Sequence, residues 1–202
     1  TLVTSPDRPT ALVTSGDGSR AMFGTRNGKL YGINVSTSSQ LSEVNNFGGN
    51  PLRALAFSPG ERYLATGHLD GSVRILSGDG RTIYRRLYGP GARVSALEFS
   101  PNGKFLVAAS HDGNVYMWNM QNLDNPPLFF TENSGFVLSL CFSGNSNFFY
   151  SGSVGFARMV GRPTEPENMA RDFCSLLGRN LSQEEWNQYF GEELPYQETC
   201  PE

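Results

Sequence analysis

The composition of the chain predicts a folded protein with many tight turns. Its 202 residues suit one domain or two small ones. Apolar residues make up 38%, aromatic residues 12% and charged residues 17%, so the chain is too apolar for a disordered one. The 23 glycines and 12 prolines exceed the roughly 14 and 10 of average usage, and a helical bundle rarely tolerates so many.

Charge and hydropathy exclude further classes. The net charge of −3 argues against a nucleic-acid groove, which needs a basic field. The longest apolar runs have about five residues, whereas a membrane span needs ~20. The chain starts at Thr1 without a signal-peptide pattern. We therefore expect a cytoplasmic protein without a membrane segment, either processed or part of something longer.

Three cysteines are too few for a disulfide scaffold or a zinc cluster. Cys141 lies in an apolar stretch and is expected to be a small core residue. Cys174 and Cys200 both lie in the C-terminal tail, where they can pair. Because intracellular thiols usually stay reduced, the unpaired state is the first expectation.

An internal repeat organises most of the chain. Four matching segments end in a serine, so that a serine recurs every 42 or 43 residues, at Ser15, Ser58, Ser100 and Ser143. The match continues to a glycine 13 residues further on in the first three copies, whereas the fourth is one residue shorter and lacks the acidic turn residue. Four short strands every ~42 residues is the period of a propeller blade.

The third copy shows the strand pattern most clearly. Alternating apolar residues and intervening turn residues predict four strands, at 94–99, 105–110, 115–118 and 128–131. Asp112 and Gly113 suit the hairpin turn between the second and third strands, because glycine accepts positive φ.

These residues resemble the WD-repeat β-propeller family. The resemblance rests on residues 99–106, 110–113 and 115–118 of the third copy and covers roughly residues 10–160. Only this copy keeps the strand-ending tryptophan, Trp118, and the usual Gly-His pair before the inner strand is missing. The family's buried Asp–His–Ser–Trp network is therefore incomplete in every copy, and apolar packing must do more to hold the blades together.

The resemblance implies an all-β propeller of about four blades over residues 1–162, with blades starting near residues 10, 52, 94 and 137. Family rings commonly need more blades, within ~4–8, so the ring is expected to be partial. An open ring exposes apolar blade faces and strand edges. We therefore expect either a homodimer that completes the ring or a fragment of a larger propeller, and Thr1–Ser5 is a candidate strand for the open edge.

Residues 163–202 predict a short helical tail packed on the propeller. The first helix is expected to begin at a capping box over residues 164–167 and to present Met169 and Phe173 on its apolar face. A second capping box over residues 182–185 opens a helix with Trp186 and Tyr189. Two short helices are marginal alone, so these four apolar residues are expected to dock on the propeller.

The tail also resembles the C-terminal segment of bacterial multidomain WD-repeat proteins. The resemblance rests on residues 178–186 and 195–201. It implies a bacterial signalling or regulatory protein with further N-terminal domains.

Candidate catalytic and metal-binding residues are few. His68 and His111 fall in the turns between second and third strands, where we expect them exposed or bonded to the turn. Asp70 and Asp112 are interpreted as turn formers that cap backbone amides. Glu98 is the one charged residue in the recurring inner strands, and one acid is not an acid–base pair. We expect no cofactor, no metal and no catalysis.

The leading hypothesis for function is a protein-interaction scaffold with an unidentified protein partner, and no nucleic acid or membrane. In the family, loops before the first strand and between the second and third build the binding rim. They correspond here to residues 48–53, 89–93 and 132–136 and to the turns at Asn27, Leu69 and His111. Arginine and aromatic residues dominate binding hot spots, so Arg53, Arg93 and Phe136 are the candidate contacts. The alternatives are a propeller hydrolase with a channel site and a ligand-sensing lid on an attached effector domain.

Overall fold

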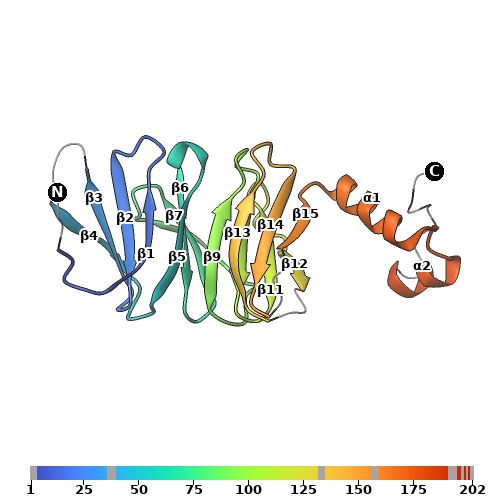
Figure 1. The fold of residues 1–202 in the computed structure, drawn as a ribbon, viewed down its shortest axis with the longest axis horizontal. Coiled ribbons are helices and arrows are strands. Elements are labelled where there is room, and N and C mark those ends of the chain that lie inside the picture. The colour runs from blue at the N-terminus through green and yellow to red at the C-terminus, as the bar shows by residue number, and fades with distance from the viewer. Residues whose placement is uncertain are drawn as a thin grey trace. The chain divides into compact units, whose positions relative to one another are not determined.

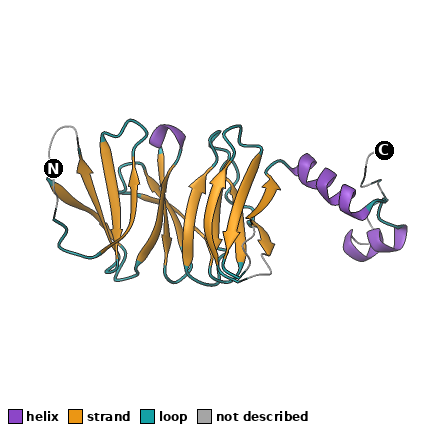
Figure 2. Ribbon diagram, in the orientation of Figure 1, coloured by secondary structure: helices purple, strands orange, loops and turns teal. Residues whose placement is uncertain are grey.

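The computed structural model divides the chain into two compact units, Thr1–Gly161 and Arg162–Glu202. It describes residues 4–35, 40–131, 135–155, 159–190, 195, 196, 198 and 200. The first unit consists of antiparallel sheets joined by turns, and the second contains the helices of the tail (Figure 2).

Four antiparallel sheets, called blades 1 to 4, follow one another along the chain (Figure 1). In each blade the strands pair in chain order, so the first strand is at one edge and the last at the other. Blade 1 contains β1 (Pro9–Thr14), β2 (Arg20–Thr25), β3 (Lys29–Asn34) and β4 (Leu41–Asn46). Blade 2 contains β5 (Leu52–Phe57), β6 (Tyr63–His68), β7 (Val73–Ser77) and β8 (Ile83–Leu87), with the 3₁₀ turn η1 (Pro59–Glu61) after β5. Blade 3 contains β9 (Val94–Phe99), β10 (Phe105–Ser110), β11 (Asn114–Asn119) and β12 (Leu128–Thr131), and blade 4 contains β13 (Val137–Phe142), β14 (Phe148–Ser153) and β15 (Met159–Pro163).

The first strands of successive blades lie side by side. β5 contacts both β1 and β9, and β9 also contacts β13. Within the described residues no comparable contact joins β13 back to β1. This is the arrangement of propeller blades around an axis in an open arc, and the predicted all-β propeller fold with a short helical tail is confirmed.

The core lies between the blades. One cluster joins blades 1 and 2 around the fully buried Leu30, Leu52 and Leu64. A second joins blades 2 and 3 and contains Trp118, which is only 2% exposed. The tryptophan that the sequence analysis singled out therefore belongs to the interface between these two blades.

Two glycines in the middle strands permit this close approach. A Cβ on Gly24 of β2 would lie 2.4 Å from the Cβ of Leu52, and one on Gly67 of β6 would lie 2.5 Å from Val94. Leu52 and Val94 begin the first strand of the following blade. Part of the glycine excess therefore arises from blade packing rather than from turns.

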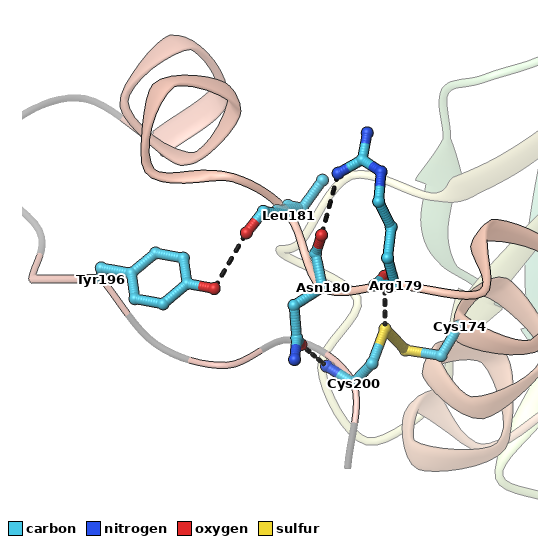
Figure 3. Close-up of a disulfide and its surroundings, with 6 residues drawn as sticks. All are labelled: Cys174, Arg179, Asn180, Leu181, Tyr196 and Cys200. Carbon is cyan, nitrogen blue, oxygen red and sulfur yellow. Dashed lines mark hydrogen bonds between the residues drawn. A yellow bond between two sulfur atoms is a disulfide. The ribbon is translucent and has the colours of Figure 1, made fainter. Parts of the chain in front are cut away.

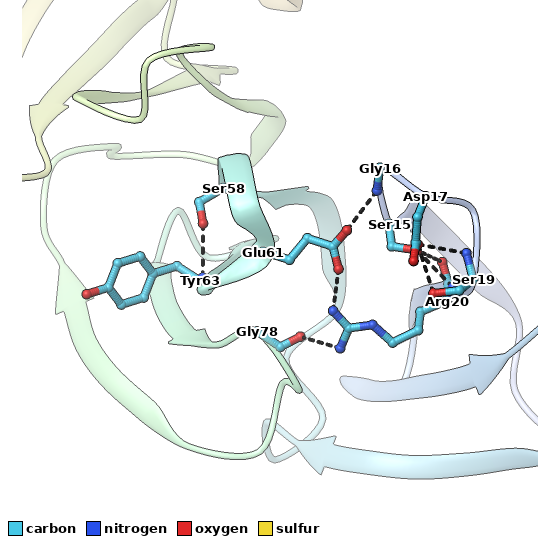
Figure 4. Close-up of polar contacts among 9 residues, drawn as sticks. All are labelled: Ser15, Gly16, Asp17, Ser19, Arg20, Ser58, Glu61, Tyr63 and Gly78. Atoms are coloured by element: carbon cyan, nitrogen blue, oxygen red, sulfur yellow. Dashed lines mark hydrogen bonds and ion pairs between the residues drawn. The ribbon is translucent and has the colours of Figure 1, made fainter.

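The recurring serine at the end of each first strand closes the following turn. Ser100 Oγ accepts a hydrogen bond from the Phe105 amide at 2.9 Å and donates one to Asn102 at 2.7 Å. Ser143 and its turn repeat the arrangement. In blade 2 the residues after Ser58 form η1, which directs Glu61 toward Gly16 and Arg20 of blade 1 (Figure 4).

Blade 4 differs from the others because one of its flanks is uncovered. Phe148 and Met159 on this flank are 40% and 68% exposed, whereas their counterparts in blade 3, Phe105 and Met117, are buried. Cys141 lies on the same flank and is exposed. The expectation that Cys141 is a core residue is therefore wrong, because no other blade in the described part of the chain packs on this flank. Blade 4 has three strands in the described residues. Of the candidate segment Thr1–Ser5, residues 1–3 lie outside that part, and Thr4 and Ser5 form no strand.

The tail contains α1 (Pro166–Leu177) and α2 (Gln183–Phe190). The second predicted capping box is confirmed, because Ser182 N donates to Glu185 at 2.8 Å and Glu185 N donates to Ser182 Oγ at 3.2 Å. The first is wrong in its position: the N-cap of α1 is Glu165, whose side chain makes no capping hydrogen bond, and Pro166 occupies N1. Proline is suited to that place because its missing N–H would be unpaired there anyway.

A disulfide joins Cys174 of α1 to Cys200 (Figure 3). Cys200 N donates to Asn180 Oδ1 at 2.6 Å, and the Tyr196 hydroxyl donates to the Leu181 carbonyl at 2.9 Å. The expectation of reduced thiols is therefore wrong for this structure. The C-terminal segment is held instead to the loop that joins the two helices.

Candidate interaction surface

A bond that all four blades repeat joins each rim loop to the turn between the second and third strands of its own blade. Residues 132–134 of one predicted loop lie outside the described residues. The amide after each second strand donates to the carbonyl of the loop that precedes the same blade's first strand. The four bonds are Arg26 N to Arg8 O, Leu69 N to Pro51 O, His111 N to Arg93 O and Val154 N to Phe136 O, all 2.9–3.0 Å long. These bonds place His111 beside Arg93 in blade 3.

A β-bulge positions Arg53. The register of the first strand shifts once in every blade, around Thr10, Arg53, Ser95 and Leu138. In blades 1 and 3 the bulged side chain reaches the next blade: Thr10 Oγ1 donates to the Leu52 carbonyl at 2.6 Å, and Ser95 Oγ donates to the Val137 carbonyl. A β-bulge changes the direction in which a side chain points. In blade 2 the residue at the bulge is Arg53, so the redirected side chain carries a guanidinium.

Three arginines lie close enough to affect one another electrostatically, and a histidine lies beside them. Burial, followed by the charges of Arg93 and Arg26, lowers the pKa of Arg53 below its usual value. Burial, followed by the charges of Arg93 and Arg53, likewise lowers the pKa of His111. Arg53 and Arg93 are half-buried and form no ion pair within the described part of the chain. The arginines of this group therefore repel one another, and no acidic side chain within the group offsets their charge.

Phe136 completes this group on the side of blade 4. Its ring stacks on His111 with centroids 4.5 Å apart and planes 13° apart. Phe136 is 52% exposed, so one face of the ring remains open. We call Arg26, Arg53, Arg93, His111 and Phe136 the rim cluster.

Sequence reasoning found three members of the rim cluster and missed the roles of the other two. The sequence predicts Arg53, Arg93 and Phe136 as separate loop residues, and the structure connects them through His111. Arg26 and His111 each follow their recurring serine by 11 residues, and that position carries the repeated amide bond. The repeat spacing was the signal that could have joined them.

The two histidines differ in environment. His68 is fully buried at the end of β6, and Thr66 Oγ1 lies 3.0 Å from its Nε2. Burial, followed by the charge of Arg74, lowers the pKa of His68 to about 4. The expectation of an exposed histidine is wrong here, because Phe47 covers the ring at a centroid distance of 4.9 Å. The alternative expectation, a histidine bonded to nearby backbone, is closer to the structure, because the Asn50 carbonyl of the loop before β5 lies 3.5 Å from Nδ1.

The predicted turn-forming aspartates behave as expected. Asp70 accepts from the Ser72 amide and Asp112 from the Asn114 amide, each at 2.9 Å. Asp112 also accepts from the Gly91 amide at 2.8 Å and from the Tyr116 hydroxyl at 2.9 Å. In the family pattern a histidine before the inner strand binds this aspartate. In blade 3 the Gly91 amide and the Tyr116 hydroxyl bind it instead.

Acidic and metal-binding groups do not converge in the part of the chain that the structure describes. Glu98 is half-buried; burial raises its pKa, and it accepts a bond from Phe142 N at 3.3 Å. No group of three or more His, Cys, Asp or Glu side chains suited to a metal occurs among the described residues. No described helix is long and apolar enough to cross a membrane.

The tail residues predicted to dock are placed only in part. Trp186 is 8% exposed, and its ring lies edge-on to Tyr196 of the same unit at 5.7 Å. Met169 is half-buried. Phe173 and Tyr189 lie in α1 and α2, but their side chains are outside the described residues. Docking of the tail on the propeller stays a prediction.

Comparison with known families agrees with this architecture. The model of the WD domain, G-beta repeat, matches residues 41–77, 81–119 and 125–155, together just over half of the chain. The chain belongs to the WD-repeat family. Each matched repeat starts near the last strand of one blade and ends within the next, so the sequence repeat and the blade are offset by one strand. Proteins with this repeat are generally non-catalytic scaffolds, and the comparisons indicate no enzyme family.

The WD-repeat chain is similar to short stretches of much larger proteins. It is 30% identical over 116 residues to telomerase protein component 1 of Rattus norvegicus, covering 55% of this chain and 4% of that protein. It is 27% identical over 109 residues to cilia- and flagella-associated protein 251 of Mus musculus, covering 53% and 8%. It is 31% identical over 71 residues to echinoderm microtubule-associated protein-like 2 of Rattus norvegicus, covering 35% and 11%. The chain thus spans a small fraction of the relatives that it matches.

Proposed function

We propose that this WD-repeat chain is a protein-interaction module whose contact surface is the rim cluster. The observation that carries the proposal is the convergence of three arginines and an exposed aromatic ring at one end of a rigid sheet scaffold. Rigid scaffolds carry binding residues on their loops, and arginine and aromatic side chains dominate binding hot spots.

Charge reversal at the rim tests this function. Arg93→Glu and Phe136→Ala are introduced separately into the whole chain, and proteins captured from the cells of origin are quantified. We expect both variants to lose specific partners that the parent chain retains. Arg81→Glu is the matched control, because Arg81 lies in the turn between β7 and β8, a turn at the other end of the blade. Equal capture by all the variants would refute the proposal.

Completion of the ring by a second copy is proposed on the two uncovered flanks. Leu12 on the flank of blade 1 is 67% exposed and pairs across strands with Phe23. Met159 on the flank of blade 4 is equally exposed. Light scattering should give a dimer mass that falls to the monomer mass in Leu12→Lys and Met159→Lys, while Arg93→Glu leaves it unchanged. A monomer at high micromolar concentration rules the dimer out.

A bacterial signalling protein in the cytoplasm remains the proposed setting, and it rests on the resemblance of the tail. The relatives reported above come from rat and mouse, and they do not support a bacterial context. The Cys174–Cys200 disulfide also bears on the compartment, because such bonds persist mainly in oxidising ones. Thiol trapping in intact cells tests the location: reduced cysteines support the cytoplasm, and a disulfide contradicts it.

A further inference from the structure

The arginines of the rim cluster differ from most other arginines of the chain. Arg20 pairs with Glu61, Arg85 with Asp124 and Arg179 with Glu185. Arg74 lies over the ring of Phe47 at 4.9 Å. Arg53 and Arg93 have neither an acidic partner nor a ring partner in the described part of the chain. Their Nε atoms, like that of Arg74, are shielded from water without an acceptor.

The aspartates of the neighbouring turns form no ion pair with Arg53 or Arg93 in the described part of the chain, and their oxygens accept hydrogen bonds from other groups. Asp70 accepts both the amide and the hydroxyl of Ser72. Asp112 accepts from backbone amides and from Tyr116. The chain as a whole carries a net charge of −3, so an excess of positive charge is not a property of the whole molecule.

The backbone that carries the two arginines is held in position before any ligand arrives. Arg53 stands at a bulge in β5, and Arg93 belongs to the loop that receives the His111 amide at 2.9 Å. A guanidinium presents its donors as a planar fork that matches the oxygens of carboxylate and phosphate groups. An anion at the ends of the two side chains would relieve the repulsion between the arginines.

The aromatic pair beside the arginines indicates which class of molecule presents the anion to them. Phe136 stacks on His111 and keeps about half of its surface open. Apolar surface beside a group of positive charges suits a chain that offers an apolar side chain next to its anionic group. A polypeptide has this combination, whereas the phosphodiester backbone of a nucleic acid has a long anionic track that a single basic spot cannot follow.

We propose that the rim cluster binds an acidic peptide segment, with the anionic groups on Arg53 and Arg93 and a neighbouring apolar side chain on Phe136. The inference rests on the proposed function and adds the chemistry of the partner. The anion is a phosphate ester or a pair of adjacent carboxylates, which share the oxygen geometry that the guanidinium fork recognises.

Three peptides of one length distinguish the sources of the anion. The first has phosphoserine followed by leucine, the second has two glutamates followed by leucine, and the third has serine followed by leucine. Fluorescence anisotropy with the whole chain should show binding of the first or the second at least ten-fold tighter than the third. The tighter of the two identifies the source. Equal binding of all three, or tighter binding of a single-stranded oligonucleotide, overturns the proposal.

Variants then assign the binding to the rim cluster. Arg53→Met with Arg93→Met should weaken binding of the acidic peptide at least ten-fold, and Arg81→Met should leave it unchanged. The double variant should also unfold at a higher urea concentration than the parent, because it loses repulsion between the two charges. Unchanged peptide affinity in the double variant overturns the proposal.

The failures of the two proposals are distinguishable. If Arg93→Glu abolishes capture of partners but acidic peptides do not bind, the rim is an interaction surface for another chemistry and only the present inference is wrong. If capture and peptide affinity are both unchanged in the rim variants, both proposals are wrong.

Discussion

Glu61 of blade 2 forms an ion pair with Arg20 of blade 1 and accepts the hydrogen bond of the Gly16 amide at 2.8 Å (Figure 4). The backbone of Glu61 has a φ of 56°, which a non-glycine residue rarely adopts. At the rim end, Thr10 bonds the Leu52 carbonyl. Blades 1 and 2 are therefore joined by polar contacts at both ends, with the leucine cluster between them.

Coupling between Arg20 and Glu61 should be measurable. The two side chains are 34% and 22% exposed, so solvent screens the pair only in part. A double-mutant cycle with Arg20→Met and Glu61→Gln, followed by urea unfolding, should give about 0.5–1 kcal/mol. Arg81 and Asp79 form the matched control pair, because they are far more exposed and should show little coupling. Equal coupling in both pairs would contradict a contribution from the blade interface.

Gly78 should be intolerant of any side chain. A Cβ at this position would lie 1.7 Å from the carbonyl oxygen of Glu61, and backbone cannot move aside cheaply. We expect Gly78→Ala to lower the free energy of unfolding by about 3 kcal/mol or more. Gly144→Ala is the control, since nothing lies within 4 Å of its Cβ, and it should change stability by less than about 0.5 kcal/mol. Chemical denaturation of both variants makes the comparison, and similar losses would show that the contact is not decisive.

His68 should make the stability of the propeller depend on pH. Its pKa is lowered to about 4 in the folded chain, compared with about 6.5 when unfolded. The unfolded chain therefore binds the proton more readily, and stability is lost as the pH falls from about 6.5 toward 4. The loss over this window is about 3 kcal/mol. Urea unfolding at several pH values should show this slope in the parent chain and a flatter one in His68→Gln. Parallel slopes would exclude His68 as the cause.

Much of the propeller is predictable because its signals are local and repeated. Three of the four strands expected in the third copy have the observed bounds, and β11 is one residue longer at each end. The serine turns and the capping box at Ser182 also depend on residues only two to five positions apart. Such contacts can be inferred from spacing alone.

The errors concern residues whose environment is set by distant parts of the chain. His68 is buried because Phe47 and the Asn50 carbonyl, from the loop before β5, lie against its ring. Cys141 is exposed because no further blade of the described residues packs on that flank of blade 4. The rim cluster was only partly predictable, because the family pattern selects its loops but cannot show that Arg26, Arg53 and Arg93 share one electrostatic environment.

Reduction of the Cys174–Cys200 disulfide should loosen the tail. The bond closes a loop of 26 residues, and loops of that length typically lose about 3 kcal/mol of stability when opened. Trp186 packs on Tyr196 inside this loop, so its fluorescence should shift to longer wavelength on adding dithiothreitol, while the buried Trp118 contributes a constant signal. Cys174→Ser with Cys200→Ser should show the shifted spectrum without reductant and no response to it. A parent chain whose spectrum does not respond to reductant would mean that the helices hold Trp186 without the disulfide.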